Sequence, residues 1–358
     1  MTHKERLAKA LANQPVDQLP CAEMLWAETV QKYTTQGRLQ PGENLFNHFD
    51  MSWQRCGPLN GVANLDQNEI LLEETADTRT FKDGNGATLQ AWKDGSGTPE
   101  HIAYDITDRD AWDRLIKPHL LSLDERRLYT QAYRETRARA IAEQRACVAS
   151  GLAPFELMTR VCGHENLLIG MALDPDWGRD MALTYADFTV RHFRTLFDKE
   201  GAPDHLFFFE DLGMKGRPFM SPAMYEEILQ PAHARLFAFA HELGCKVIVH
   251  SCGMVEPLVP GLVDAGMDCL QAMEVKAGMD VCYLAKRYGG RLAFCGNIDV
   301  RVLCTNDRRQ IDEALRRTIP PVLEAGSGYI LHSDHSIPPE VEYETLSYFL
   351  RRGRELAG

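Results

Sequence analysis

Short apolar segments alternate with longer helical ones from about residue 146 to the end of the chain, and this alternation limits the fold more than any other feature. The short segments are rich in β-branched and aromatic residues, as buried strands are. We expect strands at 146–150, 206–209, 246–250, 268–272, 292–294 and 329–331. Strands separated by helices pair in parallel, so the sequence predicts an α/β fold built of strand–helix units.

Two architectures fit this pattern, an open doubly wound sheet and a (β/α)8 barrel. No G-x-G-x-x-G motif follows an early strand, which removes the main mark of a dinucleotide-binding open sheet. The polar residues after the strands favour a barrel, because there they would meet at one mouth. We predict a single distorted (β/α)8 TIM barrel over residues 1–358, decorated by N-terminal helices and by a β-ribbon insertion at 70–105.

The composition narrows the range of partners. An apolar content of 44% and a charged content of 25% are those of a globular protein. A net charge of -12 argues against nucleic acid or an anionic membrane surface as a partner. No apolar run is long enough to span a bilayer, and the N-terminus lacks the apolar core of a signal peptide, so we expect a cytoplasmic protein. A homodimer is compatible with the sequence.

Five of the expected strands end in polar or titratable residues. In a barrel these ends converge at the mouth where active sites lie. Separately, each has a simpler explanation: Asp211 and Asp299 are equally well read as helix caps, and Cys295 as a core thiol. The residues are Glu210, Asp211, His250, Cys252, Glu274, Lys276, Cys295, Asn297, Asp299, Ser333, Asp334 and His335.

The pair His250 and Cys252 is the strongest candidate for a metal site. Zinc accepts imidazole nitrogen and thiolate sulfur together, and a catalytic zinc takes three protein ligands. We expect the third from His335, with Cys295, Asp334 and Glu210 as alternatives. Without a metal, the pair would be a buried thiol beside a hydrogen-bonded histidine.

Three segments carry a family resemblance: 249–253 (VHSCG), 295–299 (CGNID) and 335–339 (HSIPP). They resemble the uroporphyrinogen decarboxylase superfamily, which includes cobamide-dependent methyltransferases as well as decarboxylases. The opening KER at 4–6 with DQLP at 17–20, and FEDL at 209–212 with Ser221-Pro222, resemble other parts of the same family. The resemblance covers essentially the whole chain and implies a distorted (β/α)8 barrel.

The resemblance is closer to the methyltransferase branch. The decarboxylases grip propionate groups with an arginine-rich N-terminal segment, whereas the matching stretch at 22–28 has no arginine and contains Glu23 and Glu28. The methyltransferases hold zinc with His-x-Cys and a late cysteine, and alignment on the 337–339 turn puts His335 at that cysteine. The same turn carries a functional histidine in the decarboxylases.

The resemblance implies a zinc-dependent methyltransferase that moves a methyl group between a corrinoid protein and a small thiol, folate, methoxyl or methylamine compound. The corrinoid would come with a partner protein, because the chain lacks an Asp-x-His-x-x-Gly motif. Glu210 and Asp334 would handle protons, and substrate would be bound by Asp211, Glu274, Asn297 and Asp299.

Two other functions remain open on the sequence alone. The first is a metal-independent decarboxylase or lyase acting on a smaller carboxylic acid, with Asp50 or Asp334 as the acid. The second is a non-catalytic binding module that keeps the pocket without turnover.

Overall fold

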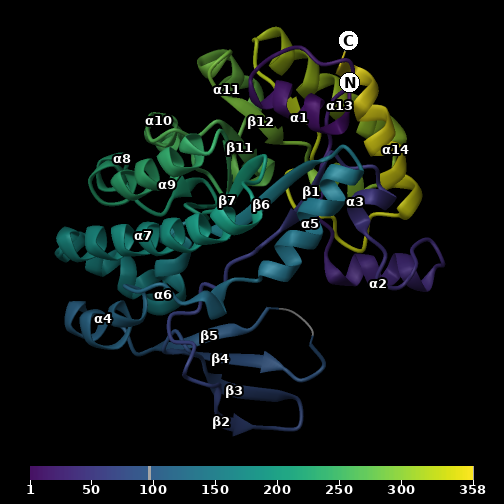
Figure 1. Cartoon of the computed structure of the whole chain (residues 1–358). Helices are drawn as coiled ribbons and strands as arrows, with labels where there is room; N and C mark the ends of the chain where they lie inside the picture. Colours follow the sequence, from purple (N-terminus) through teal and green to yellow (C-terminus); the bar gives the residue numbers. More distant parts are fainter. Residues whose placement is uncertain (96–97, 358) are drawn as a thin grey trace.

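A seven-stranded parallel sheet forms the centre of the molecule. The computed structural model describes residues 1–95 and 98–357 (Figure 1). The strand order is β1-β6-β7-β10-β11-β12-β13, and every neighbouring pair is parallel. The strands are β1 (Trp53–Cys56), β6 (Ala146–Leu152), β7 (His205–Phe209), β10 (Lys246–Ser251), β11 (Cys269–Ala272), β12 (Ala293–Gly296) and β13 (Tyr329–Ile330).

The predicted parallel strands are therefore confirmed, whereas an eighth barrel strand is not found among the described residues. The segment around Cys21 lies at that place: it bridges to Leu331 beyond β13, and its carbonyl accepts the Ser52 N–H just before β1 (2.8 Å). Pro20 on one side of Cys21 interrupts a hydrogen-bond ladder, because proline has no N–H to donate. The structure thus shows a curled sheet whose two edges are joined by an irregular segment.

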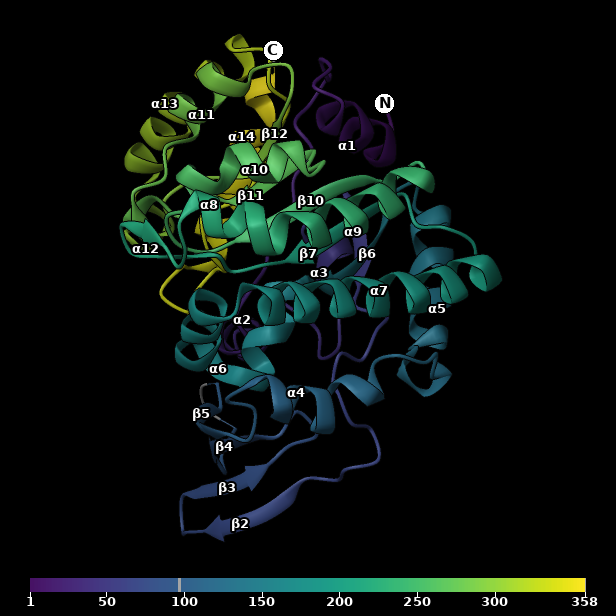
Figure 2. The ribbon, with the colours of Figure 1, turned by 90° about the vertical axis from the view of Figure 1, so that its left-hand side faces the viewer.

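Helices cover the outer face of this sheet (Figures 1 and 2). The longest, α7, begins at the Asp174-Pro175 signal, where the Asp174 side chain accepts the Trp177 N–H. The helices are α1 (His3–Leu11), α2 (Ala27–Thr35), α3 (Leu45–His48), α4 (Arg109–Leu115), α5 (Thr130–Ala142), α6 (Pro154–Leu173), α7 (Pro175–Glu200), α8 (Pro222–Met224), α9 (Gln230–Glu242), α10 (Val259–Asp264), α11 (Val281–Tyr288), α12 (Val300–Cys304), α13 (Arg308–Glu324) and α14 (Tyr343–Arg354).

A separate antiparallel sheet occupies the predicted ribbon region. Its order is β2-β3-β4-β5, with strands β2 (Ile70–Glu74), β3 (Thr78–Lys82), β4 (Ala87–Trp92) and β5 (Glu100–Tyr104). Both ribbon views place it at the end of the molecule away from the two termini. The predicted insertion at 70–105 includes residues 96 and 97, which lie outside the described residues. A two-stranded hairpin of β8 (Gly213–Met214) and β9 (Arg217–Pro218) follows β7.

The inner face of the parallel sheet has an apolar floor. Alternate residues of a strand point to the same side, so each strand contributes one side chain per layer. Trp53, Phe207, Ile248 and Cys269 belong to the buried floor, and Cys295 lies fully buried in the same cluster. One step further along the strands, at the carboxyl ends, lie Phe209, His250, Gln271 and Cys295, each opposite the next across the sheet.

Within the described residues, none of the helices combines the length and the apolar character needed to cross a membrane.

His205, at the start of β7, should make the fold sensitive to acid. It is buried, and neither ring nitrogen has a hydrogen-bond partner in the described part of the chain. Burial lowers the pKa of His205 to about 4, below the value of about 6.5 in an unfolded chain. Below pH 6.5 the unfolded state binds a proton that the folded state does not bind until about pH 4, so stability is lost across that window.

We therefore expect the protonation of His205 alone to lower the free energy of unfolding by about 1.6 kcal/mol between pH 6.5 and pH 5. Urea unfolding at both pH values measures this change. Between pH 6.5 and pH 5, His205→Leu should lose correspondingly less free energy of unfolding than the unchanged protein. Replacement of the exposed His119 by leucine is the matched control. An equal pH dependence in the unchanged protein and His205→Leu would contradict this assignment.

Candidate metal centre

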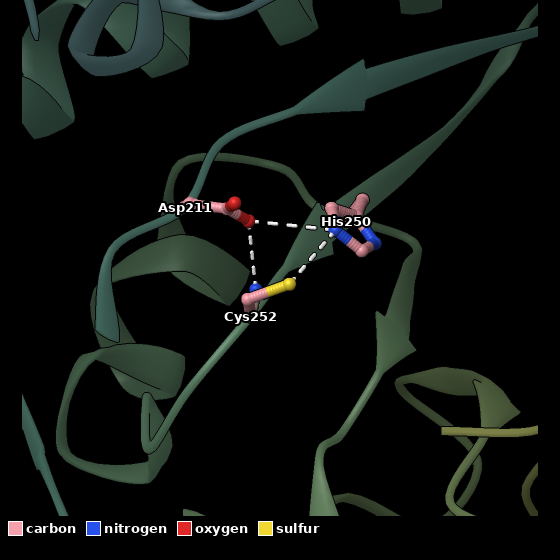
Figure 3. A group of neighbouring side chains, drawn as sticks. All are labelled: Asp211, His250 and Cys252. Carbon is pink, nitrogen blue, oxygen red and sulfur yellow. Dashed lines mark hydrogen bonds and ion pairs between the residues drawn. The ribbon is translucent and has the colours of Figure 1, made fainter. Parts of the chain in front are cut away.

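Three possible metal ligands converge at the carboxyl ends of two neighbouring strands (Figure 3). β7 and β10 pair in parallel with Phe209 opposite His250, so the residues that follow both strands leave the sheet side by side. Asp211, His250 and Cys252 each offer one ligand atom, and these atoms lie within 4.8 Å of one another. We call these three residues the ligand cluster.

The two distances from His250 to the other members of the ligand cluster fit a tetrahedral ion. His250 Nε2 lies 3.3 Å from Cys252 Sγ and 3.4 Å from Asp211 Oδ1. Ligands about 2.0–2.3 Å from a tetrahedral zinc are separated by about 3.3–3.8 Å. An imidazole, a thiolate and a carboxylate are all zinc ligands, and three protein ligands leave the fourth position open, as in catalytic sites.

The electrostatics of the ligand cluster also favour a cation. Burial lowers the pKa of His250, which keeps the imidazole neutral and able to coordinate. Burial raises the pKa of Cys252, and the negative charges of Asp211 and Glu274 raise it further. Without a cation the thiol stays protonated, whereas a bound divalent ion would deprotonate it.

Gln271 on β11 sets which nitrogen of His250 faces the ligand cluster. His332 Nδ1 donates to the Ser333 carbonyl (2.6 Å), so its Nε2 accepts from the Gln271 amide (3.3 Å). The Gln271 oxygen then faces His250 and accepts the Nδ1–H of that ring. His250 Nε2 is left with its lone pair toward Cys252 and Asp211, as metal coordination requires.

Backbone hydrogen bonds hold the loop after β10. The Cys252 N–H donates to Asp211 Oδ1 (2.8 Å), and the Gly253 N–H donates to Glu274 Oε2 (2.9 Å). Gly253 has φ +77°, and a Cβ there would lie 2.2 Å from the carbonyl carbon of Gly213. Only glycine fits this turn, which brings Cys252 back toward His250.

The structure changes the roles expected for the two acidic residues after β7. Asp211, expected to bind substrate or cap a helix, lies in the ligand cluster. Glu210 is fully buried and accepts the N–H groups of Phe155 and Glu156 at the start of α6, both at 3.0 Å. It also bonds His233 Nε2 (2.6 Å). All these partners lie outside the ligand cluster, so Glu210 is unsuited to the expected proton transfer or metal binding.

The expected third ligands lie outside the ligand cluster. The His335 ring stacks on Trp26, with 6.1 Å between ring centres. Cys295 lies fully buried opposite Gln271 on the neighbouring strand, and burial raises its pKa well above the ordinary thiol value. Asp334 accepts the N–H groups of Val275 and Val300, both at 2.8 Å, so each of its two carboxylate oxygens is hydrogen-bonded to a loop backbone.

The remaining expected substrate-binding residues hold loops at the mouth. Asp299 caps α12 by accepting the Arg301 N–H, so its helix-cap interpretation fits the structure. Asn297 donates to the Met273 carbonyl (2.6 Å) and to that of Met279 (3.2 Å). Glu274 forms an ion pair with Lys276 (2.9 Å) beside its bond to Gly253, which keeps a carboxylate close to the ligand cluster.

The position of Asp50 corrects the sequence analysis, which expected this residue as a catalytic acid. It precedes β1 and forms ion pairs with His3 and Arg145, and Arg145 stands directly before β6. Asp50 therefore lies at the amino ends of the parallel strands, opposite the mouth that contains the ligand cluster. It cannot act as the acid of a site built at the carboxyl ends.

Sequence reasoning missed Arg55, near the end of β1. Its guanidinium carbon lies 4.9 Å from the ring centre of Phe207 and 5.3 Å from that of Phe209. Burial lowers the pKa of Arg55 to about 10, so it remains a cation at neutral pH. The available signal was an arginine within a four-residue strand, immediately before Cys56-Gly57-Pro58.

Comparisons with known proteins identify the family of this chain. Residues 84–356 match the model of the uroporphyrinogen decarboxylase (URO-D) family. Over 154 residues the chain is 30% identical to a methylated-thiol–coenzyme M methyltransferase of Methanosarcina mazei, an alignment that covers 43% of this chain and 39% of that protein. A solved structure described as a methyltransferase from Methanosarcina mazei superposes over 100% of both chains, with a TM-score of 0.67 and 16% identity. The chain belongs to the uroporphyrinogen decarboxylase family.

Proposed function

We propose that this chain is a zinc-dependent methyltransferase that exchanges a methyl group between a corrinoid carried by a partner protein and a small thiol. The observation that carries the proposal is the ligand cluster, where the ligand atoms of Cys252 and Asp211 both lie at tetrahedral spacing from His250 Nε2 and within 4.8 Å of each other. The related methyltransferase of Methanosarcina mazei is described as acting on methylated thiols, which favours a sulfur compound over the folate and amine alternatives.

In this proposal His250 Nε2, Cys252 Sγ and Asp211 Oδ1 hold the zinc, and Gln271 keeps His250 in the coordinating tautomer. Bound zinc supplies a Lewis acid that lowers the pKa of a substrate thiol, so that the thiolate is present at neutral pH. Phe207 and Phe209 cover one side of His250, with 6.4 and 5.4 Å between ring centres.

The thiolate sulfur would attack the methyl carbon, forming the sulfur–carbon bond while the carbon–cobalt bond breaks and leaves its electron pair on cobalt. The proton released by the thiol needs an acceptor at the mouth. Glu274, held beside the cluster by Gly253 and Lys276, is a buried carboxylate available for this role.

The decarboxylase alternative is less well supported. Of its two expected acids, Asp50 lies at the other end of the sheet, and Asp334 has both oxygens engaged by backbone N–H groups. Release of carbon dioxide from small carboxylic acids without metal would nevertheless favour that alternative over ours.

The test is incubation of zinc-loaded protein with methylcobalamin and a small thiol, followed by the cobalt absorption spectrum. We expect conversion to the reduced, demethylated form only when protein, zinc and thiol are all present. An unchanged spectrum with every thiol tried would contradict the proposed activity. An unchanged spectrum together with tight thiol binding would instead indicate a binding module.

A further inference from the structure

Glu23 is a buried carboxyl group in the segment that joins the two edges of the parallel sheet. Its side chain is fully buried, and no lysine or arginine forms an ion pair with it within residues 1–95 and 98–357. Burying an isolated carboxylate is costly, because the charge loses its water and gains no counter-ion. Glu23 has no role in the proposed methyl transfer.

The hydrogen bonds of Ser333 show where the proton of Glu23 lies. The Ser333 hydroxyl lies 2.5 Å from the His335 carbonyl and 3.0 Å from Glu23 Oε2. A hydroxyl has one proton to donate, and a carbonyl oxygen can only accept. The Ser333 proton is therefore used by the His335 carbonyl, so the bond to Glu23 requires a proton on Oε2. The other oxygen, Oε1, accepts the Ser333 N–H (2.5 Å), as the carbonyl oxygen of a neutral acid does.

The surroundings of Glu23 keep it neutral at pH 7. Burial, with a smaller contribution from the negative charge of Asp334, raises the pKa of Glu23 to about 8. The other titratable groups that face it are two thiols, a phenol and an imidazole, those of Cys21, Cys295, Tyr329 and His332. Burial raises the pKa of both thiols and of the phenol and lowers the pKa of the imidazole, so none of these groups supplies a counter-ion.

His332 connects Glu23 to the ligand cluster. Its Nδ1 lies 3.6 Å from Glu23 Oε2 and donates to the Ser333 carbonyl instead (2.6 Å). Burial lowers the pKa of His332 to about 3, so its Nε2 has no proton and accepts from the Gln271 amide (3.3 Å). The Gln271 oxygen is thereby turned to His250 Nδ1, which leaves His250 Nε2 free for the ligand cluster.

The proton of Glu23 has an alternative position, on His332 Nε2. Glu23 would then be a carboxylate and His332 an imidazolium, which donates through both nitrogens. Gln271 would have to turn its oxygen to His332 and its NH2 group to His250 Nδ1. The His250 proton would move to Nε2, and no lone pair of that ring would face the ligand cluster.

We infer that Glu23 is a positioning residue for the metal site: as a neutral acid it holds the proton that would otherwise turn Gln271 and His250 away from the metal. The consequence for zinc rests on the proposed function, whereas the protonation of Glu23 does not. The inference gives a buried residue far along the chain from the ligand cluster a defined part in preparing it.

Glu23→Gln tests the protonation in metal-free protein. The amide keeps both hydrogen bonds to Ser333, donating from nitrogen and accepting at oxygen, but it cannot ionise. A glutamate in the unfolded chain ionises near pH 4.5, so the unchanged protein must bind a proton on folding and loses stability as the pH rises from there toward 8. We expect the gain in melting temperature caused by Glu23→Gln to be about 2–4 °C larger at pH 7.5 than at pH 5.

Glu28→Gln is the matched control, because Glu28 lies exposed in the first turn of α2, on the same stretch of chain. Its effect on the melting temperature should be the same at both pH values. The infrared difference between the unchanged protein and Glu23→Gln at pH 7 should contain the C=O band of a protonated carboxyl group. A carboxylate band in its place, or an effect of Glu23→Gln that does not grow with pH, would overturn the inference.

Ser333→Ala tests the link to the metal site, because it removes the acceptor of the Glu23 proton. Part of the protein should then carry this proton on His332, and nitrogen NMR of the metal-free form should show His250 protonated at Nε2. Zinc affinity, measured by chelator competition, should fall by about tenfold. Adding Glu23→Gln to Ser333→Ala should reverse both changes, since an amide has no proton to pass on. If the double variant keeps both changes, Ser333 acts on the loop structure alone and the positioning role fails.

The outcomes separate this inference from the proposed function. Unchanged protein that binds no zinc would refute the proposed function, while the melting, infrared and NMR measurements on metal-free protein would still decide the role of Glu23. Bound zinc together with an ionised Glu23 would leave the metal site standing and overturn the inference.

Discussion

Replacing Cys252 with alanine should remove bound zinc and lower methyl transfer to a thiol by at least about 100-fold, since loss of groups that merely support a ligand already costs 10–100-fold. Cys252 supplies the sulfur of the ligand cluster, and its Sγ lies 3.3 Å from His250 Nε2. Zinc content by atomic emission and the rate of cobalt reduction measure the two effects.

The matched control is Cys282→Ala, because Cys282 is a partly buried thiol on α11 outside the ligand cluster. It should retain both zinc and activity. If Cys252→Ala kept its zinc and its rate, Cys252 would be an ordinary buried thiol and the proposed chemistry would need another site.

The second large effect concerns the third ligand. Asp211→Asn keeps a hydrogen-bond acceptor for the Cys252 N–H and removes only the charge, so it should lower zinc affinity by about 10–100-fold. His335→Ala should change the affinity by less than about threefold, because the His335 ring stacks on Trp26 outside the ligand cluster. Competition with a chromophoric chelator measures both affinities. If His335→Ala lost more zinc affinity than Asp211→Asn, the third ligand would be His335, as expected from the sequence.

His250 and Cys252 could be predicted because their chemistry lies within one short segment. A β-branched run ends in an imidazole, with a thiol two residues later, and a single strand end suffices to bring them together. Their positions also depend on Gly253, which has a φ of +77°. From the sequence, a glycine there indicates only that such a turn is allowed.

Asp211 could not be chosen over Glu210 or His335 from the sequence. The choice depends on the pairing of β7 with β10 and on the chain path after Phe209, which turns Glu210 toward α6 and Asp211 toward Cys252. An acidic residue after a strand is as typical of a helix cap as of a ligand.

The strands of the central sheet also include some that could be predicted from the sequence and one that could not. The apolar ones, such as β7 and β10, could be predicted because burial on both faces requires a continuous apolar run. β1 has the sequence WQRC, which carries no such run, and it is held by pairing with β6 instead. The sequence analysis did not recognise β1 as a strand. It therefore did not consider the polar residues at its end, and Arg55 was missed.

The most direct test of the central claim is X-ray absorption at the zinc edge of protein purified without chelators. The account predicts about one zinc per chain with one sulfur near 2.3 Å and nitrogen or oxygen neighbours near 2.0–2.1 Å, and loss of the sulfur signal in Cys252→Ala. A zinc with two sulfurs, a zinc with none, or protein that binds no zinc would contradict a site formed by Asp211, His250 and Cys252.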